Sequence, residues 1–249
     1  MAGPELRRTT RDFTLPRMLN RPAPLPDPPM ELLVGADWQM SFGERAAMEG
    51  VLTQLQPELS IELGTAGGGS LAAIVGHSRE VHSFDLEEPG PLASRFSDVQ
   101  FHTGDSHVLL PQVLAELADQ GRNVDFVLVD GDHSADGVQQ DVEDLLASPA
   151  IGQTIIVLHD TSNERVREGL ERVRYEGRPK VAYVDLDFLG GYVLSEPGKD
   201  HELWGGLGLI WVSATRSAYF RSGVRQDRYL PAAEILRLGL QSRLAHSYG

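Results

Sequence analysis

Two segments of this sequence, VDFVLVD (124–130) and TIIVLHD (154–160), are nearly continuous runs of apolar residues that end in aspartate. Such runs are typical of strands that are buried on both faces, as in a parallel sheet. Between them, ADGVQQDVEDLLA (135–147) has the apolar spacing of an amphipathic helix. The same alternation extends over most of the chain. It predicts an α/β fold with a doubly wound, mainly parallel sheet and helices on both faces.

The other elements follow from the spacing of apolar residues in the same way. SFGERAAMEGVLTQL (41–55) is predicted to be a helix with Ser41 as its N-cap, and Pro111 is expected in the first turn of a later helix. The segment 186–205 is rich in glycine, aromatic and charged residues and is predicted to be a loop. The further predicted strands are 59–63, 80–85, 99–105, 180–185 and 206–212, and the further helices begin near Gly69 or Ser70 and cover 106–120, about 163–175 and 231–246.

The length of the chain, 249 residues, suits one large α/β domain with additions at its ends. Residues 1–35 are rich in proline and arginine and are predicted to form an extended arm. Residues 36–215 are predicted to form the domain, and residues 216–249 a helical extension. The helix in this extension is a candidate surface for a homo-oligomer.

Composition and charge exclude several classes of function. The sequence contains no cysteine, which excludes a disulfide framework, a thiolate metal site and a thiol nucleophile. The formal net charge of −14 disfavours a nucleic-acid partner, because phosphate backbones bind clusters of lysine and arginine. No apolar run approaches the length of a membrane span, and the N-terminal residues lack the apolar stretch of a signal peptide. We therefore expect a cytoplasmic protein with no membrane partner.

A glycine-rich loop, GTAGGGS (64–70), follows the first predicted strand, where doubly wound sheets bind their ligands. A phosphate-binding P-loop would need lysine and then serine or threonine after Gly69, where the sequence has Ser70 and Leu71. A dinucleotide fingerprint, G-x-G-x-x-G, is matched only in part, because Ala66 stands at the second glycine. A third pattern, E-x-G-x-x-x-G-x-S, is matched in full by Glu62, Gly64, Gly68 and Ser70.

The third pattern resembles the cofactor-binding loop of class I S-adenosylmethionine-dependent methyltransferases. This cofactor has an amino-acid tail and a sulfonium in place of a pyrophosphate, so an acid beside the loop suits its positive charge. The resemblance implies a Rossmann-like, seven-stranded, mostly parallel sheet with an antiparallel last strand. It implies further cofactor-binding residues: Asp85 near the ribose, Asp105 and Ser106 near the adenine, and Asp130. A helix cap is the alternative role for each aspartate, and a glycine turn without a ligand is the alternative for the loop.

A second group of polar residues closes the fourth and fifth predicted strands. Adjacent strands lie about 4.8 Å apart, so the side chains at their ends are expected to meet. Carboxylates so close together are costly unless a cation or a proton lies between them. Oxygen ligands with limited imidazole suit Mg²⁺ or Mn²⁺ better than a structural zinc ion. The members of this group are Asp130, Asp132, His133, His159 and Asp160.

The sequence DGDH…HD resembles the metal-dependent O-methyltransferases of sugar and natural-product pathways, over roughly residues 40 to 215. These are relatives of macrolide-sugar and rhamnosyl O-methyltransferases and of cephalosporin-hydroxylase-like proteins. The resemblance implies that Asp130 and Asp160 hold the metal and that His133 is the general base. His159 stands where some relatives have a carboxylate ligand, so it either contacts the metal or supports Asp160. Asp132 is expected to cap its loop.

The implied function is Mg²⁺- or Mn²⁺-assisted O-methylation of a sugar, a nucleotide-linked sugar or a glycosylated natural product by S-adenosylmethionine. A divalent ion lowers the pKa of a hydroxyl group, and a nearby imidazole accepts the proton. Tyr192 and Trp204 are candidates for stacking on the acceptor. The alternatives left open are a metal-independent methyltransferase, a nicotinamide-dependent oxidoreductase and a cofactor-binding protein without turnover.

Overall fold

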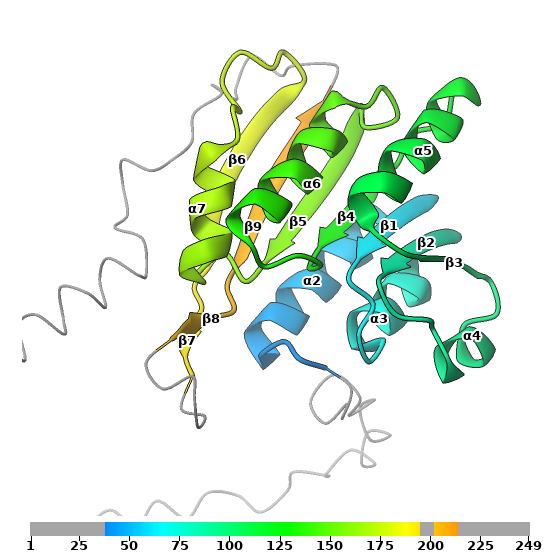
Figure 1. Ribbon diagram of the computed structural model, residues 1–249, viewed down its shortest axis with the longest axis horizontal. Coiled ribbons are helices and arrows are strands. Elements are labelled where there is room, and N and C mark those ends of the chain that lie inside the picture. Colours follow the sequence, from blue (N-terminus) through cyan, green and yellow to red (C-terminus); the bar gives the residue numbers. More distant parts are fainter. Residues whose placement is uncertain (1–37, 195–201, 214–249) are drawn as a thin grey trace, which may run out of the picture.

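The computed structural model describes residues 38–194 and 202–213 of the chain (Figure 1). Seven strands form one sheet in the order β3-β2-β1-β4-β5-β9-β6. Neighbouring strands are parallel except at β9, which runs antiparallel to both β5 and β6. The predicted Rossmann-like fold with a mostly parallel sheet is therefore confirmed. The strands of this sheet are β1 (Leu59–Leu63), β2 (Glu80–Asp85), β3 (Val99–Thr103), β4 (Phe126–Val129), β5 (Gln153–His159), β6 (Val181–Leu189) and β9 (Leu207–Ser213).

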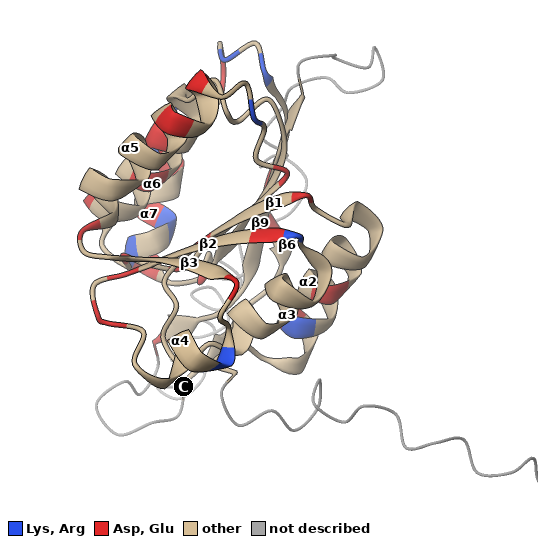
Figure 2. Ribbon diagram, turned by 90° about the vertical axis from the view of Figure 1, so that its right-hand side faces the viewer, with Lys and Arg blue, Asp and Glu red and all other residues tan. Residues whose placement is uncertain are grey.

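Helices cover both faces of the sheet, as predicted. Figure 2 shows α5, α6 and α7 on one face and α2 and α3 on the other. The short helix α4 precedes β3 at the edge of the sheet (Figure 1). The helices are α2 (Phe42–Leu55), α3 (Gly69–His77), α4 (Pro91–Arg95), α5 (Ser106–Asp119), α6 (Ala135–Ala147) and α7 (Glu164–Arg172).

The sheet separates two hydrophobic clusters, because successive side chains of a strand point to opposite faces. In β4, Val127 and Val129 join the cluster under α5, α6 and α7. Phe126 and Leu128 join the cluster under α2 and α3. All four side chains are at most 3% exposed. Burial on both faces explains why this segment of the sequence is an uninterrupted apolar run.

Local sequence signals fix the starts of two helices beside the site. Ser41 is the N-cap of α2, as predicted: the Glu44 N–H donates to Ser41 Oγ at 3.4 Å, and the Ser41 N–H donates to Glu44 Oε2 at 2.5 Å. This reciprocal pair is a capping box. Asn163 caps α7 in turn, because its Oδ1 accepts a hydrogen bond from the Arg165 N–H at 3.0 Å.

The prediction that Pro111 lies in the first turn of its helix is wrong. Helix α5 begins at Ser106 and continues to Asp119, so Pro111 lies in its interior. There proline supplies no N–H for the carbonyl of His107, four residues earlier. The helix continues because its inner side chains are buried in the core. These side chains are Leu110, Val113, Leu114 and Leu117.

The prediction of one loop over 186–205 is wrong for the described part of that segment. Strand β6 extends to Leu189, and β7 (Tyr192–Val193) pairs antiparallel with β8 (Leu203–Trp204). Gly205 and Gly206, with φ values of +70° and +86°, then lead the chain into β9. The long pairing of β6 with β9 is the tertiary contact that holds this segment in extended form.

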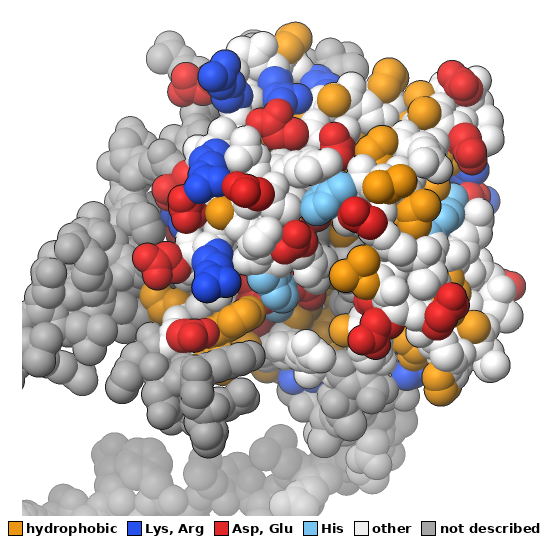
Figure 3. Space-filling view, viewed as in Figure 1, with side chains coloured by type: hydrophobic (Ala, Val, Ile, Leu, Met, Phe, Trp, Pro, Cys, Tyr) orange, Lys and Arg blue, Asp and Glu red, His pale blue; other side chains and the backbone are white. Residues whose placement is uncertain are grey.

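Two arginines of α7, Arg167 and Arg172, are paired with acids. In Figure 3, Lys and Arg side chains alternate there with Asp and Glu side chains. Arg167 lies 2.8 Å from Asp187, and Arg172 lies 2.7 Å from Asp136. These two pairs offset part of the positive charge of α7, but they do not test the expected absence of a nucleic-acid partner. That absence stays a prediction.

Several predictions concern residues outside the described ranges. These are the arm over 1–35, the extension over 216–249 with its helix at 231–246, and the middle of the segment 186–205. Within the described ranges, no helix combines the length and apolar character needed to span a bilayer. The cytoplasmic location and the homo-oligomer stay predictions.

Candidate active site

The predicted site residues lie at or just beyond the carboxyl ends of five neighbouring strands, β3, β2, β1, β4 and β5. The chain leaves β1 toward β2 on one side and later returns to β4 on the other side. Ligands bind at such a reversal of strand order in doubly wound sheets. Strands β3 and β4 are shorter than predicted and end at Thr103 and Val129. Asp105 and Asp130 therefore stand in the loops beyond these strands.

Gly64 brings the glycine-rich loop against the end of β4. Its φ is +90°, and a Cβ at this position would clash with the carbonyl oxygen of Asp130. Gly68 has a φ of +76° at the start of α3, and a Cβ there would lie 2.9 Å from Leu92 Cδ2. Any other residue at either position would combine an unfavourable backbone conformation with a steric conflict. The two glycines are thus required by the shape of the loop.

Glu62 lies behind this loop and has no exposed surface. Its Oε1 accepts a hydrogen bond from Ser70 Oγ and its Oε2 accepts one from Ser83 Oγ, both at 2.7 Å. Burial raises the pKa of Glu62 to about 8, although the two serine hydroxyls act in the opposite direction. Glu62 therefore joins β1 to α3 and β2, and it carries a proton near neutral pH.

Asp85 supports the loop from β2. Its Oδ2 accepts hydrogen bonds from the Thr65 N–H at 2.9 Å and the Ala66 N–H at 3.0 Å, and its Oδ1 accepts one from the Glu87 N–H at 2.9 Å. Burial raises the pKa of Asp85, but these backbone donors outweigh burial and the net effect lowers it. The carboxylate predicted at the ribose thus holds the loop backbone in this structure, and its role toward a ribose stays a prediction.

A pocket lies between the loop and the segment that precedes α2. The segment from Trp38 to Met40 was not predicted to belong to the site. It reaches the loop through tertiary packing, because Met40 is buried in the cluster under α2 and α3. No motif in the sequence indicates this approach. The pocket is lined by Trp38, Gln39, Met40, Gly64, Thr65, Ala66, Gly67, Gly69, Ser70 and Asp130.

Asp105 and Ser106 belong to the start of α5. Asp105 is the N-cap, and its Oδ1 accepts a hydrogen bond from the His107 N–H at 3.0 Å. Ser106 Oγ donates to Asp141 Oδ1 at 3.2 Å. Neither residue is among those that line the pocket beside the loop. Capping of α5 by Asp105 and the hydrogen bond from Ser106 to Asp141 explain where these side chains lie. Their roles near an adenine stay predictions.

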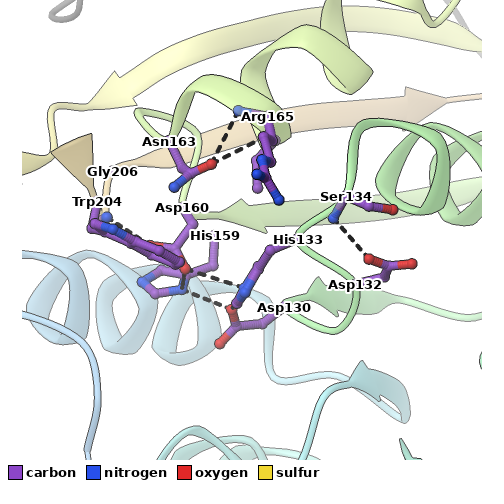
Figure 4. A network of polar contacts seen from close by, with 12 residues as sticks. Asp130, Asp132, His133, Ser134, His159, Asp160, Asn163, Arg165, Trp204 and Gly206 are labelled. Carbon is purple, nitrogen blue, oxygen red and sulfur yellow. Dashed lines mark hydrogen bonds and ion pairs between the residues drawn. The ribbon is translucent and has the colours of Figure 1, made fainter. Parts of the chain in front are cut away.

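Asp130, His159 and Asp160 come together at the ends of β4 and β5 (Figure 4). His159 Nδ1 lies 2.8 Å from Asp130 Oδ1 and 3.5 Å from Asp160 Oδ2. One ligand atom from each of the three side chains lies within 4.8 Å of the other two. Asp160 has a φ of +54°, and its Oδ1 accepts a hydrogen bond from the Gly205 N–H at 2.6 Å. The structure therefore gathers the three predicted metal ligands.

His133 stands at the rim of this group (Figure 4). Its Nε2 lies 3.2 Å from Asp160 Oδ2 and 3.4 Å from Asp130 Oδ1, and its side chain is 39% exposed. The ring of Trp204 meets the imidazole edge-on, with 5.5 Å between centroids. Asp132 caps the loop, as expected, because its Oδ1 accepts a hydrogen bond from the Ser134 N–H at 2.7 Å.

The charges of this group depend on one another. Burial lowers the pKa of His159, but the attraction of Asp130 and other nearby carboxylates outweighs it and raises this pKa well above 6.5. The hydrogen bond to Asp130 likewise raises the pKa of His133. Burial raises the pKa of Asp160, whereas for Asp130 the histidines outweigh burial and the pKa is lowered. Asp130 and the two histidines therefore stabilise one another in their charged forms.

Glu44 is a buried acid of the site that the sequence analysis missed. It lies in the first turn of α2 and has no exposed surface. Its Oε1 accepts a hydrogen bond from the Gly206 N–H at 2.5 Å and lies 3.5 Å from His159 Nε2. The sequence identifies Glu44 only as the acid of a possible capping box, S-x-x-E. Its approach to His159 comes from the packing of α2 beside β5 and β9.

The chemistry of the Asp130–His159–Asp160 group fits a divalent cation. Two carboxylates and one imidazole are gathered there. The carboxylates of Asp130 and Asp160 form ion pairs with His159 inside the group and with His133 at its rim. Carboxylate and imidazole are common ligands of divalent ions. The neighbouring pocket fits a cationic cofactor, because the carboxylate of Asp130, whose pKa is lowered, lines it.

Comparisons with known proteins agree with this architecture. Residues 61–161 match a family model described as a methyltransferase domain. The O-methyltransferase TomG from Streptomyces achromogenes, involved in tomaymycin synthesis and solved with S-adenosylmethionine, is similar in structure. It is 18% identical, with 72% of this chain and 83% of TomG covered and a TM-score of 0.53. An O-methyltransferase from Bacillus cereus, solved with S-adenosylhomocysteine, is 14% identical. The match covers 70% of this chain and 82% of the Bacillus protein, with a TM-score of 0.49. A search of curated protein sequences finds no match.

Proposed function

Because residues 61–161 match a methyltransferase-domain model, we propose that the chain is a class I S-adenosylmethionine-dependent methyltransferase that methylates a hydroxyl oxygen with the help of a divalent ion. The proposed acceptor is a sugar, a nucleotide-linked sugar or a glycosylated natural product. The observation that carries the proposal is the position of His133 Nε2, 3.2 Å from Asp160 Oδ2 and 3.4 Å from Asp130 Oδ1. A base at the rim of a cation site suits an acceptor hydroxyl, which is too weak an acid to ionise unaided.

The cofactor would bind in the pocket between the glycine-rich loop and the Trp38–Met40 segment. Gly64 keeps the loop close to Asp130, and Asp130 itself lines the pocket. A carboxylate there attracts the ammonium and sulfonium charges of S-adenosylmethionine. To bind the ribose, Asp85 would exchange its hydrogen bonds with Thr65 and Ala66 for bonds with the ribose hydroxyls.

Asp130, His159 and Asp160 would hold the divalent ion. A bound ion of this kind lowers the pKa of a hydroxyl group beside it. The negative charge of Asp130 and Asp160 raises the pKa of His133. A bound ion would offset this charge and lower the pKa again, which would favour the neutral imidazole that a general base needs.

In the proposed reaction, His133 accepts the proton of the acceptor hydroxyl at Nε2. The acceptor oxygen takes the methyl group, and S-adenosylhomocysteine is the second product. Asp130 and Asp160 then stabilise the imidazolium of His133. The protein contributes alignment and proton transfer, because the methyl donor already carries a good leaving group.

The hairpin β7–β8 provides a surface for the acceptor. Trp204 packs edge-on against His133, and Tyr192 stands opposite Trp204 in the hairpin. Aromatic rings at this place can stack on the apolar face of a sugar ring or on an aglycone. The similarity to TomG shows the fold alone, so the choice of oxygen as the methylated atom rests on His133 and the neighbouring carboxylates.

A methyl-transfer assay tests the proposal. Labelled S-adenosylmethionine is offered with a panel of free sugars, sugar nucleotides and glycosides, first with EDTA and then after addition of Mg²⁺ or Mn²⁺. We expect transfer that depends on an acceptor, is lost in EDTA and returns with the ion. If protein that binds S-adenosylhomocysteine methylates no acceptor in such a panel, the proposed activity is wrong.

A metal-independent methyltransferase is the second candidate. The observation in its favour is the raised pKa of His159, because a protonated imidazole already balances the carboxylates around it. This candidate predicts that EDTA leaves the rate of methyl transfer unchanged.

A further inference from the structure

We propose that His159, held by the buried carboxylate of Glu44, makes the Asp130–His159–Asp160 group select a divalent transition-metal ion, such as Mn²⁺ or Co²⁺, over Mg²⁺. This inference rests on the proposed function, because it concerns the same site. It adds the class of metal ion and assigns Glu44 as the positioning residue that makes His159 a ligand.

The orientation of the imidazole is the first step. His159 Nδ1 faces the carboxylates, at 2.8 Å from Asp130 Oδ1 and 3.5 Å from Asp160 Oδ2. His159 Nε2 faces the other way, 3.5 Å from Glu44 Oε1. Among the described residues this buried nitrogen has no hydrogen-bond partner at normal distance. In this structure Nδ1–H donates to Asp130, and a cation between the aspartates would take the place of that proton. The imidazole would then keep its other proton on Nε2, which faces Glu44.

Glu44 is held firmly enough to impose this orientation. Its Oε1 accepts the Gly206 N–H and its Oε2 accepts the Ser41 N–H, each at 2.5 Å. A Cβ on Gly205 would lie 2.6 Å from Glu44 Oε1, so the backbone approaches this carboxylate closely. Both oxygens are thus engaged by backbone donors, and the side chain cannot turn away from His159. A ligating histidine commonly depends on a carboxylate of this kind behind it.

The donor set then determines the class of ion. Mg²⁺ prefers oxygen ligands and retains several waters, whereas imidazole suits first-row transition ions. The side chain of His159 is only 5% exposed, so the imidazole cannot leave the group to make room for water. A Mg²⁺ ion would have to accept this nitrogen or bind with fewer protein ligands. A transition ion uses all three side chains.

Metal binding to the full chain in the absence of S-adenosylmethionine tests the inference. Calorimetric titrations give the Kd values for Mn²⁺, Co²⁺ and Mg²⁺, and pulsed electron paramagnetic resonance of the Mn²⁺ complex detects a coordinated ¹⁴N. We expect Mn²⁺ to bind at least about 10-fold more tightly than Mg²⁺ and to show a nitrogen coupling. The H159D variant removes the imidazole and supplies an oxygen, so it should lose the coupling and reduce the preference for Mn²⁺.

The E44Q variant tests the positioning residue. Glutamine has one acceptor oxygen for the N–H groups of Ser41 and Gly206, and it carries no negative charge to attract the His159 imidazole. We therefore expect Mn²⁺ affinity to fall about 10- to 100-fold, with a smaller effect on Mg²⁺. The matched control is E49Q in the same helix, which removes a carboxylate paired with His77 at 2.7 Å, away from the site. E49Q should retain the metal affinities. S-adenosylhomocysteine binding and thermal melting show whether each variant is folded, and if E44Q does not fold, the H159D result decides.

The outcomes separate this inference from the proposed function. Equal or tighter binding of Mg²⁺, or Mn²⁺ binding without a nitrogen coupling, overturns the inference while metal-assisted methyl transfer stands. Absence of any divalent binding overturns it too, and methyl transfer in EDTA then supports the metal-independent candidate. If Mn²⁺ binds with nitrogen coupling but no acceptor is methylated, the inference holds and the proposed function fails.

Discussion

At the scale of the residue, surroundings rather than residue type set the charge of the acids near the cofactor pocket. Glu62 is buried and accepts hydrogen bonds only from two serine hydroxyls, and its pKa rises to about 8. Asp85, which accepts three backbone N–H groups, has a lowered pKa. At Asp85 the backbone N–H groups together stabilise the carboxylate more than its partial burial destabilises it. Ionisation of Glu62 therefore opposes folding, whereas ionisation of Asp85 favours it.

This difference predicts the pH dependence of the E62Q variant. The pKa of Glu62 is raised from its ordinary value of 4.5 to about 8, so the folded protein holds this proton more tightly than the unfolded chain. The carboxylate therefore costs stability as pH rises from about 4.5 to 8, by at most about 1.4 kcal/mol per pH unit, and the cost is constant above pH 8. Glutamine resembles the protonated acid. The stability of E62Q relative to the native protein should thus increase over this range.

Urea unfolding at several pH values measures this effect. E58Q is the control, because the Glu58 side chain is 68% exposed and should show no such trend. A pH-independent difference between E62Q and the native protein would mean that Glu62 is ionised at little cost in the folded state.

His133 carries a second prediction at this scale. Its replacement by alanine removes the proposed base from the rim of the Asp130–His159–Asp160 group but leaves the loop and its pocket intact. We expect kcat to fall about 10²-fold or more, within the usual range for loss of a general base, while the Kd for S-adenosylhomocysteine changes little. Initial rates and calorimetry check the two parts. H77A, at the end of α3, is the control histidine, and undiminished turnover in H133A would show that another group accepts the proton.

At the scale of the element, the unit formed by β1, the glycine-rich loop and α3 is determined by backbone conformation. Gly64 and Gly68 have positive φ, and side chains at either position would meet neighbouring atoms. Helix α5 shows the opposite case, because Pro111 lies in its interior against its local preference. Burial of the inner face of α5 overrides the missing hydrogen bond. The backbone conformation of single residues thus determines the structure of the loop, whereas burial of the inner face determines the structure of the helix.

This contrast predicts different effects for two Gly→Ala changes. G64A forces a Cβ against the carbonyl of Asp130 at a φ of +90°, so we expect a loss of about 2 kcal/mol or more and at least 10-fold weaker S-adenosylhomocysteine binding. G50A lies inside α2 with nothing within 4 Å of its added Cβ and should gain about 0.5–1 kcal/mol. Denaturant unfolding and calorimetry measure both. Normal ligand affinity in G64A would show that the loop can move away from β4.

At the scale of the whole molecule, the sheet places all the candidate chemistry along one edge. Two hydrophobic clusters fill its faces and leave the carboxyl ends of the strands for polar groups. The pocket lies beyond the ends of β1 and β4, and the Asp130–His159–Asp160 group lies at the ends of β4 and β5. A ligand in the pocket would therefore contact the loop after β1, the end of β4 and the segment before α2 together.

A ligand that joins these elements should stabilise the whole fold. At a concentration of 100 times its Kd, S-adenosylhomocysteine adds about 2.7 kcal/mol, which raises Tm by about 5–10 °C for a chain of this size. NAD at the same concentration should leave Tm unchanged. Thermal scans with each ligand check the prediction, and stabilisation by NAD alone would favour the oxidoreductase alternative.

The sequence by itself determined most of the strands and helices of the main sheet and the residue types at the strand ends. Strand β4 could be predicted because it is buried on both faces and is therefore a continuous apolar run. Helix α6 could be predicted because it is buried on one face and its apolar residues recur at helical spacing. Asp130, His159 and Asp160 could be predicted to meet because parallel strands bring their carboxyl ends to one edge. Only the tertiary structure decided the contacts between elements remote in sequence. Glu44 reaches His159, Met40 reaches the glycine-rich loop and Tyr192 stands opposite Trp204 because packing of distant segments places them there, and such packing leaves no local pattern in the sequence.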